Sequence, residues 1–425
     1  MDADRLHRNN CITFAMQGIL FAIGFVFFDT SGILPRFVKE ITGSDVLAGV
    51  PQMLRLISTT LFQVLTIGTI RRVRNVRRYL TGFMLTSYLA PAVVVATLLF
   101  DATGAVIMAG LFLSLLIMWC SDGCMVISYY TVFSRTVRAG ARSTVNGIMQ
   151  TVGGIGGIGS SLVIKVLLDS DRLSLKMSYA LIFLIGLVVL ALAALAFSFT
   201  KDTPPQTHIV EDATLRGEFS KLKKVLKTNR SFVLILITQV FFTISTMTVP
   251  HLLNMFEAEL QVGSTDISTF LNFQSVGIML GGLIPVFCGK KFGNGFLVFF
   301  YSAASFLCGL ISVVCVAAHL DGFALLALIS VCGGITTCSW VAFYNVIIDV
   351  SGKNEVPVLM LGNSILSLFL SVATVVGGMI ITYIGYMWVF SIALACALFG
   401  ILLSVWTMLS VKKRKNEELC GNDEV

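Results

Sequence analysis

The chain has 425 residues, of which 56% are hydrophobic and only 12% are charged, and its mean hydropathy is +0.89. Soluble domains carry about 25% charged residues, so the composition excludes a soluble globular protein. The high hydrophobicity also excludes an intrinsically disordered chain. A membrane-spanning helix takes about 20 apolar residues, so this length has room for about twelve spans. The composition therefore predicts an all-α polytopic membrane protein.

Taken in chain order, the apolar stretches predict twelve transmembrane helices, because isolated strands leave backbone groups unpaired in lipid. The expected ranges are 11–34, 46–70, 79–100, 104–130, 143–168, 178–200, 231–253, 266–288, 295–317, 322–348, 357–383 and 387–410. The first stretch follows two arginines, as a signal peptide does. It is too long for a signal sequence and has no small-residue cleavage site, so we expect it to be retained as the first span.

The basic residues predict the orientation of these spans. With the N-terminus inside, the inner segments hold 24 of the 30 Lys and Arg residues, the outer loops hold five, and Arg55 lies within a span. The positive-inside rule then predicts that both termini are cytoplasmic. The net charge of +7 therefore reflects topology, and we expect no nucleic-acid partner.

The longest polar stretch, 201–230, lies in the middle of the chain. Leucine and phenylalanine recur there at helical spacing among lysines, which predicts an amphipathic helix on the inner membrane surface; a partner-binding helix is the alternative. This stretch divides the chain into a six-helix bundle at 1–200, a cytoplasmic linker at 201–230, a second six-helix bundle at 231–411 and a cytoplasmic tail at 412–425.

Several positions match between the two halves of the chain. A shift of 215 residues places Tyr129 on Tyr344 and Gly147 on Gly362. Together with the equal number of spans, these matches predict a parallel repeat related by an axis along the membrane normal.

The six-plus-six pattern, with both ends inside and a long central loop, resembles the major facilitator superfamily over nearly the whole chain. Between the second and third spans, Gly68, Arg77 and Arg78 fit the loop signature of that superfamily, while Arg72 stands at its acidic position. The resemblance implies that this loop takes part in the conformational change.

The stretch 28–35 resembles a group of bacterial permeases of mostly unassigned substrate. This likeness implies a multi-pass, monomeric permease of the plasma (bacterial inner) membrane. In the superfamily, helices 1, 4, 7 and 10 line the central cavity, and helices 2, 5, 8 and 11 form the seam between the halves.

Three charged residues lie well inside predicted spans, away from the span ends: Asp29, Arg55 and Asp122. Charge within the membrane is costly, so each is a functional candidate. Burial favours the protonated form of Asp122, which suits it to carry a proton or to attract a cationic substrate; a hydrogen-bonded structural Asp is the alternative. Asp29 is the second candidate proton carrier. We expect it to form an ion pair with Arg55, which either is structural or breaks during transport.

Polar and aromatic side chains on helices 4, 7 and 10 are the candidates for substrate binding. The alternative for each is ordinary interhelical packing. The residues are Trp119, Tyr129, Gln239, Thr243, Thr246, Thr337, Trp340, Tyr344 and Asn345.

Glycine pairs four residues apart occur in the fifth and eighth spans, as Gly153 with Gly157 and Gly277 with Gly281. This spacing permits close contact between helices. If these are seam helices, as the resemblance implies, smooth surfaces would let the two halves rock; static packing is the alternative.

No phosphate-binding loop, nucleophile motif or zinc motif is present, and the four histidines are scattered, so we expect no enzymatic activity, no cofactor and no metal. The ten cysteines lie mostly in apolar stretches and are interpreted as small buried hydrophobic residues.

Together these features predict an alternating-access secondary transporter of a small organic molecule. Because the sequence has no ATP site, we expect protons to be the coupling ion. Export of an apolar or cationic compound is the first interpretation, and an uptake permease for a neutral nutrient such as a sugar is the second. A lipid flippase is a third. From another class, a non-transporting membrane receptor or assembly factor remains an alternative.

Overall fold

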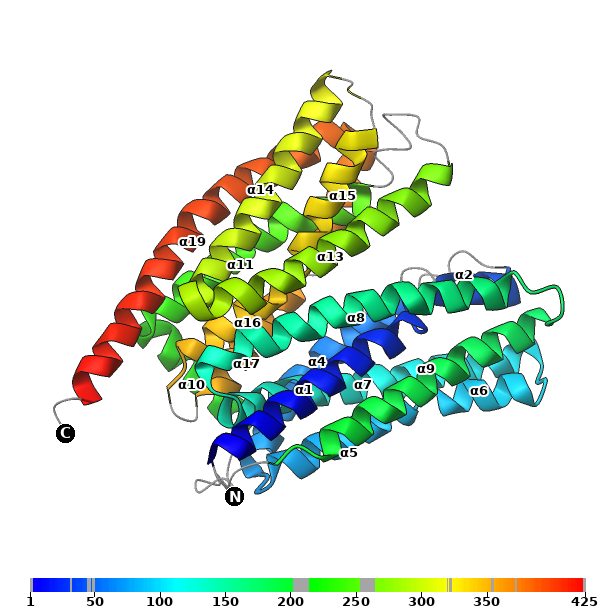
Figure 1. Ribbon diagram of the computed structural model, residues 1–425, viewed down its shortest axis with the longest axis horizontal. Coiled ribbons are helices and arrows are strands. Elements are labelled where there is room, and N and C mark those ends of the chain that lie inside the picture. The colour runs from blue at the N-terminus through cyan, green and yellow to red at the C-terminus, as the bar shows by residue number, and fades with distance from the viewer. Residues whose placement is uncertain are drawn as a thin grey trace. The chain divides into compact units, whose positions relative to one another are not determined.

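The computed structural model describes residues 3–30, 33–43, 47, 50–201, 214–252, 264–318, 320, 323–352, 355–370 and 373–422. All the regular secondary structure in these ranges is helical (Figure 1). Eleven helical segments among them are long and apolar enough to cross a membrane. The predicted all-α polytopic fold is therefore confirmed.

The chain groups into two compact units. Unit 1 comprises Met1–Arg138 and Val152–Ser220, and unit 2 comprises Ala139–Thr151 and Lys221–Val425. The boundary at residues 220 and 221 falls within the segment predicted as the linker. That segment contains the helix α10 (Leu215–Thr228).

Unit 1 is built from long apolar helices. α7 packs against α4 and α5, and α1 packs against α9 (Figure 1). Large aromatic side chains such as Phe14, Phe133 and Phe183 are fully buried between these helices. The helices are α1 (Ala3–Val26), α2 (Ile33–Thr42), α4 (Val50–Arg72), α5 (Val76–Leu89), α6 (Ala92–Leu99), α7 (Gly104–Thr136) and α9 (Leu175–Ser198), together with the later part of α8 (Ala139–Leu168).

The first predicted span, 11–34, is not one continuous helix. α1 ends at Val26, the backbone turns through residues 27–29, and α2 begins at Ile33. Pro35 lacks a backbone N–H and cannot donate to residue 31, so a helix cannot run through it without losing a hydrogen bond. In the first turn of α2 this loss costs nothing. Asp29 therefore lies at the end of α1 rather than inside a helix, which corrects the sequence-based placement.

Unit 2 has the same character, with α14 packed against α19 and α13 packed against α15. Its helices are α11 (Arg230–Ser245), η1 (Thr246–His251), α13 (Ser264–Phe292), α14 (Asn294–Ala318), α15 (Phe323–Thr337), α16 (Trp340–Asp349), α17 (Val356–Leu370), α18 (Ala373–Ile384) and α19 (Tyr386–Asn422). The predicted span 322–348 is thus divided into α15 and α16. The predicted span 357–383 corresponds to α17 and α18, on either side of residues 371 and 372, which lie outside the described ranges.

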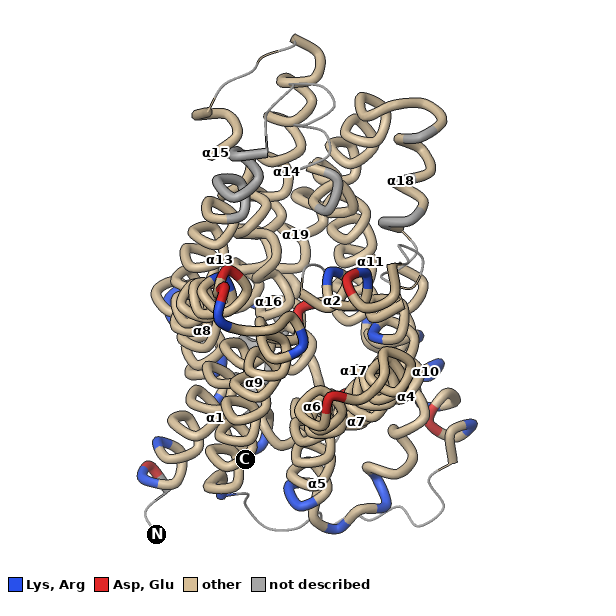
Figure 2. The backbone as a smooth tube through the Cα atoms, turned by 90° about the vertical axis from the view of Figure 1, so that its right-hand side faces the viewer, with Lys and Arg blue, Asp and Glu red and all other residues tan. Residues whose placement is uncertain are grey.

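Charged residues interrupt the apolar helices only in short segments (Figure 2). One group of polar and charged side chains in unit 2 lies where α14 begins and α16 ends. Asn294 Nδ2 donates to Asp349 Oδ2 at 2.6 Å, and Arg142 Nη1 lies 3.5 Å from Asp349 Oδ1. Such pairing is what an apolar environment demands of charged side chains.

Candidate functional site

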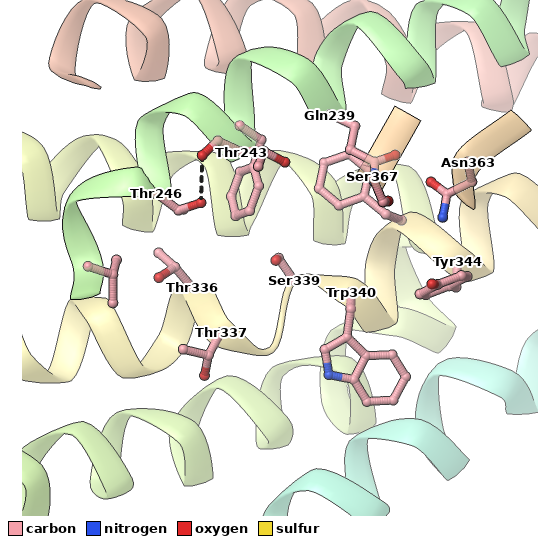
Figure 3. A pocket seen from close by; sticks show the side chains of 13 residues that line it. Gln239, Thr243, Thr246, Thr336, Thr337, Ser339, Trp340, Tyr344, Asn363 and Ser367 are labelled. Carbon is pink, nitrogen blue, oxygen red and sulfur yellow. Dashed lines mark hydrogen bonds between the residues drawn. The ribbon is translucent and has the colours of Figure 1, made fainter. Parts of the chain in front are cut away.

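Unit 2 contains a cavity of about 410 Å³. This volume lies within the range of about 300–1,000 Å³ that is typical of small-molecule pockets. The cavity is lined by side chains of α11, η1, α15, α16 and α17 (Figure 3): Gln239, Phe242, Thr243, Thr246, Val249, Thr336, Thr337, Ser339, Trp340, Phe343, Tyr344, Asn363 and Ser367.

A break in the tenth predicted span shapes one wall. α15 ends at Thr337 and α16 begins at Trp340. Between them, the backbone N–H groups of Cys338 and Ser339 donate to carbonyl groups three residues earlier, each at 3.1 Å. Figure 3 shows Thr336 and Ser339 of this segment pointing towards α11. Irregular backbone at this depth is tolerated where it lines a cavity, and transporter binding sites use such broken helices.

The opposite wall also departs from α-helical geometry. α11 ends at Ser245 and continues as the 3-10 helix η1, so Thr243 and Thr246 lie at the change of helix type. The Thr246 hydroxyl donates to the Thr243 carbonyl at 3.1 Å (Figure 3). This bond leaves the lone pairs of the Thr246 hydroxyl available to a ligand.

The lining is polar but carries no full charge. Its residues include no Asp, Glu, Lys, Arg or His in the part of the chain that the structure describes. Gln239 Oε1 and Asn363 Oδ1 are buried and have no hydrogen-bond partner among the described atoms. Buried polar atoms without partners are rare, and here both belong to the lining of one cavity, where a ligand with hydroxyl groups would satisfy them. Trp340 and Tyr344 supply aromatic surface, with ring centroids 6.4 Å apart.

Six of the predicted substrate-binding residues meet at this cavity. They are Gln239, Thr243, Thr246, Thr337, Trp340 and Tyr344. Their role as substrate ligands stays a prediction.

The lining of the cavity differs from the predicted set of unit 2 residues: one predicted residue is absent from it, and several unpredicted residues are present. Asn345 is not in the lining: it is fully buried, and its Oδ1 accepts a hydrogen bond from Asn146 Nδ2 at 3.2 Å. The sequence analysis missed Asn363 and Ser367 of α17, along with Thr336 and Ser339. The polar residues within the apolar stretch 357–383 were the signal that could have identified the first two.

Unit 1 contains a second polar cluster, centred on Arg55 of α4. The guanidinium carbon of Arg55 lies 5.1 Å from the ring centroid of Phe25 and 5.5 Å from that of Trp119. Arg55 Nη1 donates to Thr30 Oγ1 at 3.2 Å, and this hydroxyl in turn donates to Gln52 Oε1 at 2.5 Å. Cation–π contacts of this kind stabilise a cation that has lost its water.

Asp122 lies on α7, one helical turn from Trp119, and is within electrostatic range of Arg55 and Tyr88. Tyr88 Oη accepts a hydrogen bond from Gln17 Nε2 at 3.0 Å. The structure thus brings Asp122, Arg55 and Trp119 into one region of unit 1. The proton-carrying roles of Asp122 and Asp29 stay predictions. Among the described residues no salt bridge joins Asp29 to Arg55, which donates to Thr30 instead.

Tyr129, one more predicted ligand of unit 1, lies in an aromatic cluster. Its ring centroid is 5.2 Å from that of Phe14 in an edge-on contact and 6.0 Å from that of Phe133 in a stacked one. Tyr129 Oη is buried without a hydrogen-bond partner among the described residues.

The predicted glycine positions lie at close helix contacts. A Cβ atom on Gly153 would come within 2.6 Å of the Ala22 side chain on α1, and one on Gly157 within 3.5 Å of Val26. In unit 2, a Cβ atom on Gly277 would meet the Val331 carbonyl of α15, and one on Gly281 would lie 3.1 Å from the carbonyl oxygen of Ile335.

The loop residues of the predicted conformational set are partly fixed by hydrogen bonds in unit 1. Gly68 is buried near the end of α4. Arg77 Nη1 donates to the Thr200 carbonyl at 2.6 Å, and the backbone N–H of Arg78 donates to the Asn75 side chain, which caps α5. Arg72 ends α4. The part of these residues in a conformational change stays a prediction.

Solved structures with the same fold were found by comparison. The alignment with the E. coli fucose:proton symporter FucP has a TM-score of 0.73 and 15% identity, and covers 93% of this chain and 98% of that chain. A bacterial homologue of the iron transporter ferroportin, in its outward-facing state, gives a TM-score of 0.71 with 14% identity over 93% and 98% of the two chains. The proton:xylose symporter XylE gives 0.69 with 12% identity over 94% and 95%. No family model matches the sequence, and no curated protein matches it significantly. At these identities the likeness is one of fold.

Proposed function

We propose that this chain, which has the fold of the major facilitator superfamily transporters, is an alternating-access secondary transporter of a small organic molecule that carries hydroxyl groups. The cavity of unit 2 is the observation that carries this proposal. It combines uncharged hydrogen-bonding groups with the aromatic surface of Trp340 and Tyr344. Aromatic faces and amide or hydroxyl groups are what a hydroxylated solute needs for recognition without a formal charge.

This lining favours the second interpretation of the sequence, a permease for a polar nutrient such as a sugar, over the export of apolar or cationic compounds. A cationic solute would call for a carboxylate, and the described lining has none. A purely apolar solute would leave Gln239 Oε1 and Asn363 Oδ1 unsatisfied. Two of the structurally similar proteins, FucP and XylE, are named as proton symporters of sugars, which supports the same assignment.

Proton coupling belongs to the proposal, with Asp122 as the carrier and Asp29 as the second candidate. A carboxyl group within a membrane span is costly when charged, and it loses that cost by binding a proton. Its neighbour Arg55 adds a fixed positive charge, which favours the ionised form of Asp122. This attraction would change if the helices that carry the two residues moved apart, so protonation of Asp122 would be linked to conformation.

In a cell the protein would be a multi-pass, monomeric component of the plasma membrane with both termini in the cytoplasm, and the basic α10 would lie at the inner surface. α10 suits this position because Phe219 and Leu226 are exposed on it together with Lys223 and Lys227. Apolar and basic side chains on one exposed helix face favour an anionic membrane surface.

Uptake of radiolabelled solutes into proteoliposomes tests the function. We expect sugars, polyols or hydroxy acids to accumulate when an inward proton gradient is imposed, and Trp340→Ala to reduce the uptake at least tenfold. The matched control is Trp388→Ala, because Trp388 is 60% exposed on α19 and does not line the cavity. If solutes bind to the protein and none crosses the membrane, the receptor alternative replaces the transporter.

A further inference from the structure

Arg55 is a cation within a membrane-spanning helix, and no described carboxylate forms a salt bridge with it. Its side chain is only partly exposed. The other basic residues of α4, Arg71 and Arg72, stand at its end. Arg55 is the sixth residue of α4. An arginine within a membrane-spanning helix is a functional candidate, because its desolvation must be compensated.

The surroundings of Arg55 hold the guanidinium in place and leave most of its donors available. Phe25 and Trp119 contact it through their rings, and Thr30 accepts one hydrogen bond. A guanidinium has five N–H donors in a planar fork, which fits the two oxygens of a carboxylate. The aromatic rings stabilise the positive charge, but they do not accept N–H hydrogen bonds as carboxylate oxygens do.

A second donor without a partner lies in the same cluster. The Trp119 side chain is 2% exposed, and its Nε1 has no hydrogen-bond partner among the described residues. A buried indole N–H normally finds an acceptor. Trp119 Nε1 therefore lacks an acceptor, and Arg55 has only the Thr30 hydroxyl among the described residues, so an anionic group would supply acceptors to both.

Asp122 decides the charge of this cluster. When it is ionised, its field opposes that of Arg55; when it holds a proton, as the proposed function requires in one stage of transport, Arg55 retains an uncompensated charge. Among the described residues, Tyr88 of α5 and Cys124 of α7 are further titratable side chains within electrostatic range of Asp122, and Asp29 follows α1 next to Thr30. The protonated stage is therefore the one that favours an anion.

We propose that Arg55 and Trp119 form a site within unit 1 that binds the carboxylate group of a small organic acid. This inference goes beyond the uncharged cavity of unit 2, and it rests on the proposed function only for the proton that Asp122 carries. The solute carboxylate and the Asp122 carboxylate are alternative counterions of Arg55, so one negative charge stays beside the guanidinium throughout.

Matched pairs of solutes test the proposal. Thermal stabilisation and proteoliposome uptake are measured over a series of concentrations with glucose and glucuronate, galactose and galacturonate, and glycerol and glycerate. We expect the carboxylate member of at least one pair to bind more tightly than its neutral partner. Arg55→Gln should weaken that binding about 10- to 100-fold, the range of a charged hydrogen bond, while leaving the neutral partner within twofold.

Two further variants keep this experiment interpretable. Arg172→Gln removes the same charge from an exposed loop and should leave both members unchanged. Arg55→Lys retains the charge without the planar fork, so it should recover part of the carboxylate binding and show that the fold is intact. The proposal is overturned if no carboxylate is preferred, or if Arg55→Gln leaves carboxylate affinity unchanged. Uptake of neutral solutes alone would leave the proposed function standing, whereas no uptake of either set would remove both.

Discussion

Arg71 Nε and Glu218 Oε2 lie 2.7 Å apart in unit 1, and the Glu218 side chain is completely buried. This ion pair joins the end of α4 to the linker helix α10. Glu218 shares the less exposed side of α10 with Leu215 and Leu222, whereas the lysines at 223, 224 and 227 are exposed. The pair therefore holds one side of an otherwise solvent-facing helix against the transmembrane bundle.

Glu218→Gln should destabilise the protein by about 3–5 kcal/mol, because it removes the negative charge from a mostly buried ion pair. Reversible unfolding by SDS measures the change. The control is Glu40→Gln, since the Arg36–Glu40 ion pair is also short, at 2.9 Å, but its Arg36 side chain is 61% exposed. Exposed pairs contribute about 0–1 kcal/mol. Equal losses in the two variants would show that burial of Glu218 gives its ion pair no special weight.

Gly277 of α13, which the sequence analysis had pointed to, faces Gly334 of α15 at a close helix crossing in unit 2. The Cα atom of Gly334 would lie 2.9 Å from a Cβ atom on Gly277, and the reverse contact is also 2.9 Å. Gly277→Ala should therefore force α13 and α15 apart, at a cost of about 1–3 kcal/mol.

Thermal unfolding of the purified variant in detergent gives this effect as a lowered midpoint. Gly82→Ala is the matched control, because no atom lies within 4 Å of the Cβ position at Gly82 of α5. Alanine is favoured over glycine in a helix interior by about 0.5–1 kcal/mol, so this control should be neutral or more stable. A Gly277→Ala protein as stable as the Gly82→Ala protein would mean that the crossing tolerates a methyl group.

The helical membrane fold could be predicted from the sequence because lipid leaves the backbone few choices. Apolar runs indicate membrane-spanning helices, basic loops indicate their orientation, and glycine spacing indicates close helix contacts. Each of these patterns can be recognised in a single segment of the sequence. The breaks at Asp29 and Ser339 were not predicted, since both segments remain apolar on either side. Pro35 indicates the first break, but nothing in the composition of 336–341 separates a continuous helix from the observed turn.

The candidate site was predictable to the extent that it lies on one helix face. Trp340 and Tyr344 are one turn apart on α16 and meet in the cavity. Asn345 and Asn363 were harder to place, because an amide can pair with another helix or face a cavity, and only tertiary packing decides between them. The aromatic contacts of Arg55 join three separate segments, so the sequence pattern alone could not place them.

The amide groups of Asn146 and Asn345 form an isolated buried contact in unit 2. Both side chains are fully buried, and Asn146 Oδ1 and Asn345 Nδ2 have no other partner among the described atoms. Asn345→Ala should cost about 1–3 kcal/mol, because the Asn146 amide is then buried with no partner.

A double-mutant cycle with Asn146→Ala measures the contact itself. We expect the double variant to be more stable than the sum of the two single losses predicts, with a coupling free energy of about 1 kcal/mol. Strict additivity would show that the two amides do not stabilise each other.

Asp122→Asn should separate solute exchange from proton coupling. The amide cannot take up a proton, so accumulation driven by a pH gradient should be lost, while exchange of labelled for unlabelled solute at equal pH should continue. A pH-sensitive dye inside the proteoliposomes measures the accompanying proton flux. Asp101→Asn is the control, because Asp101 is an exposed loop residue at a positive φ of 48°, a conformation that asparagine also accepts. Proton-driven accumulation that survives in Asp122→Asn would move the coupling role to Asp29.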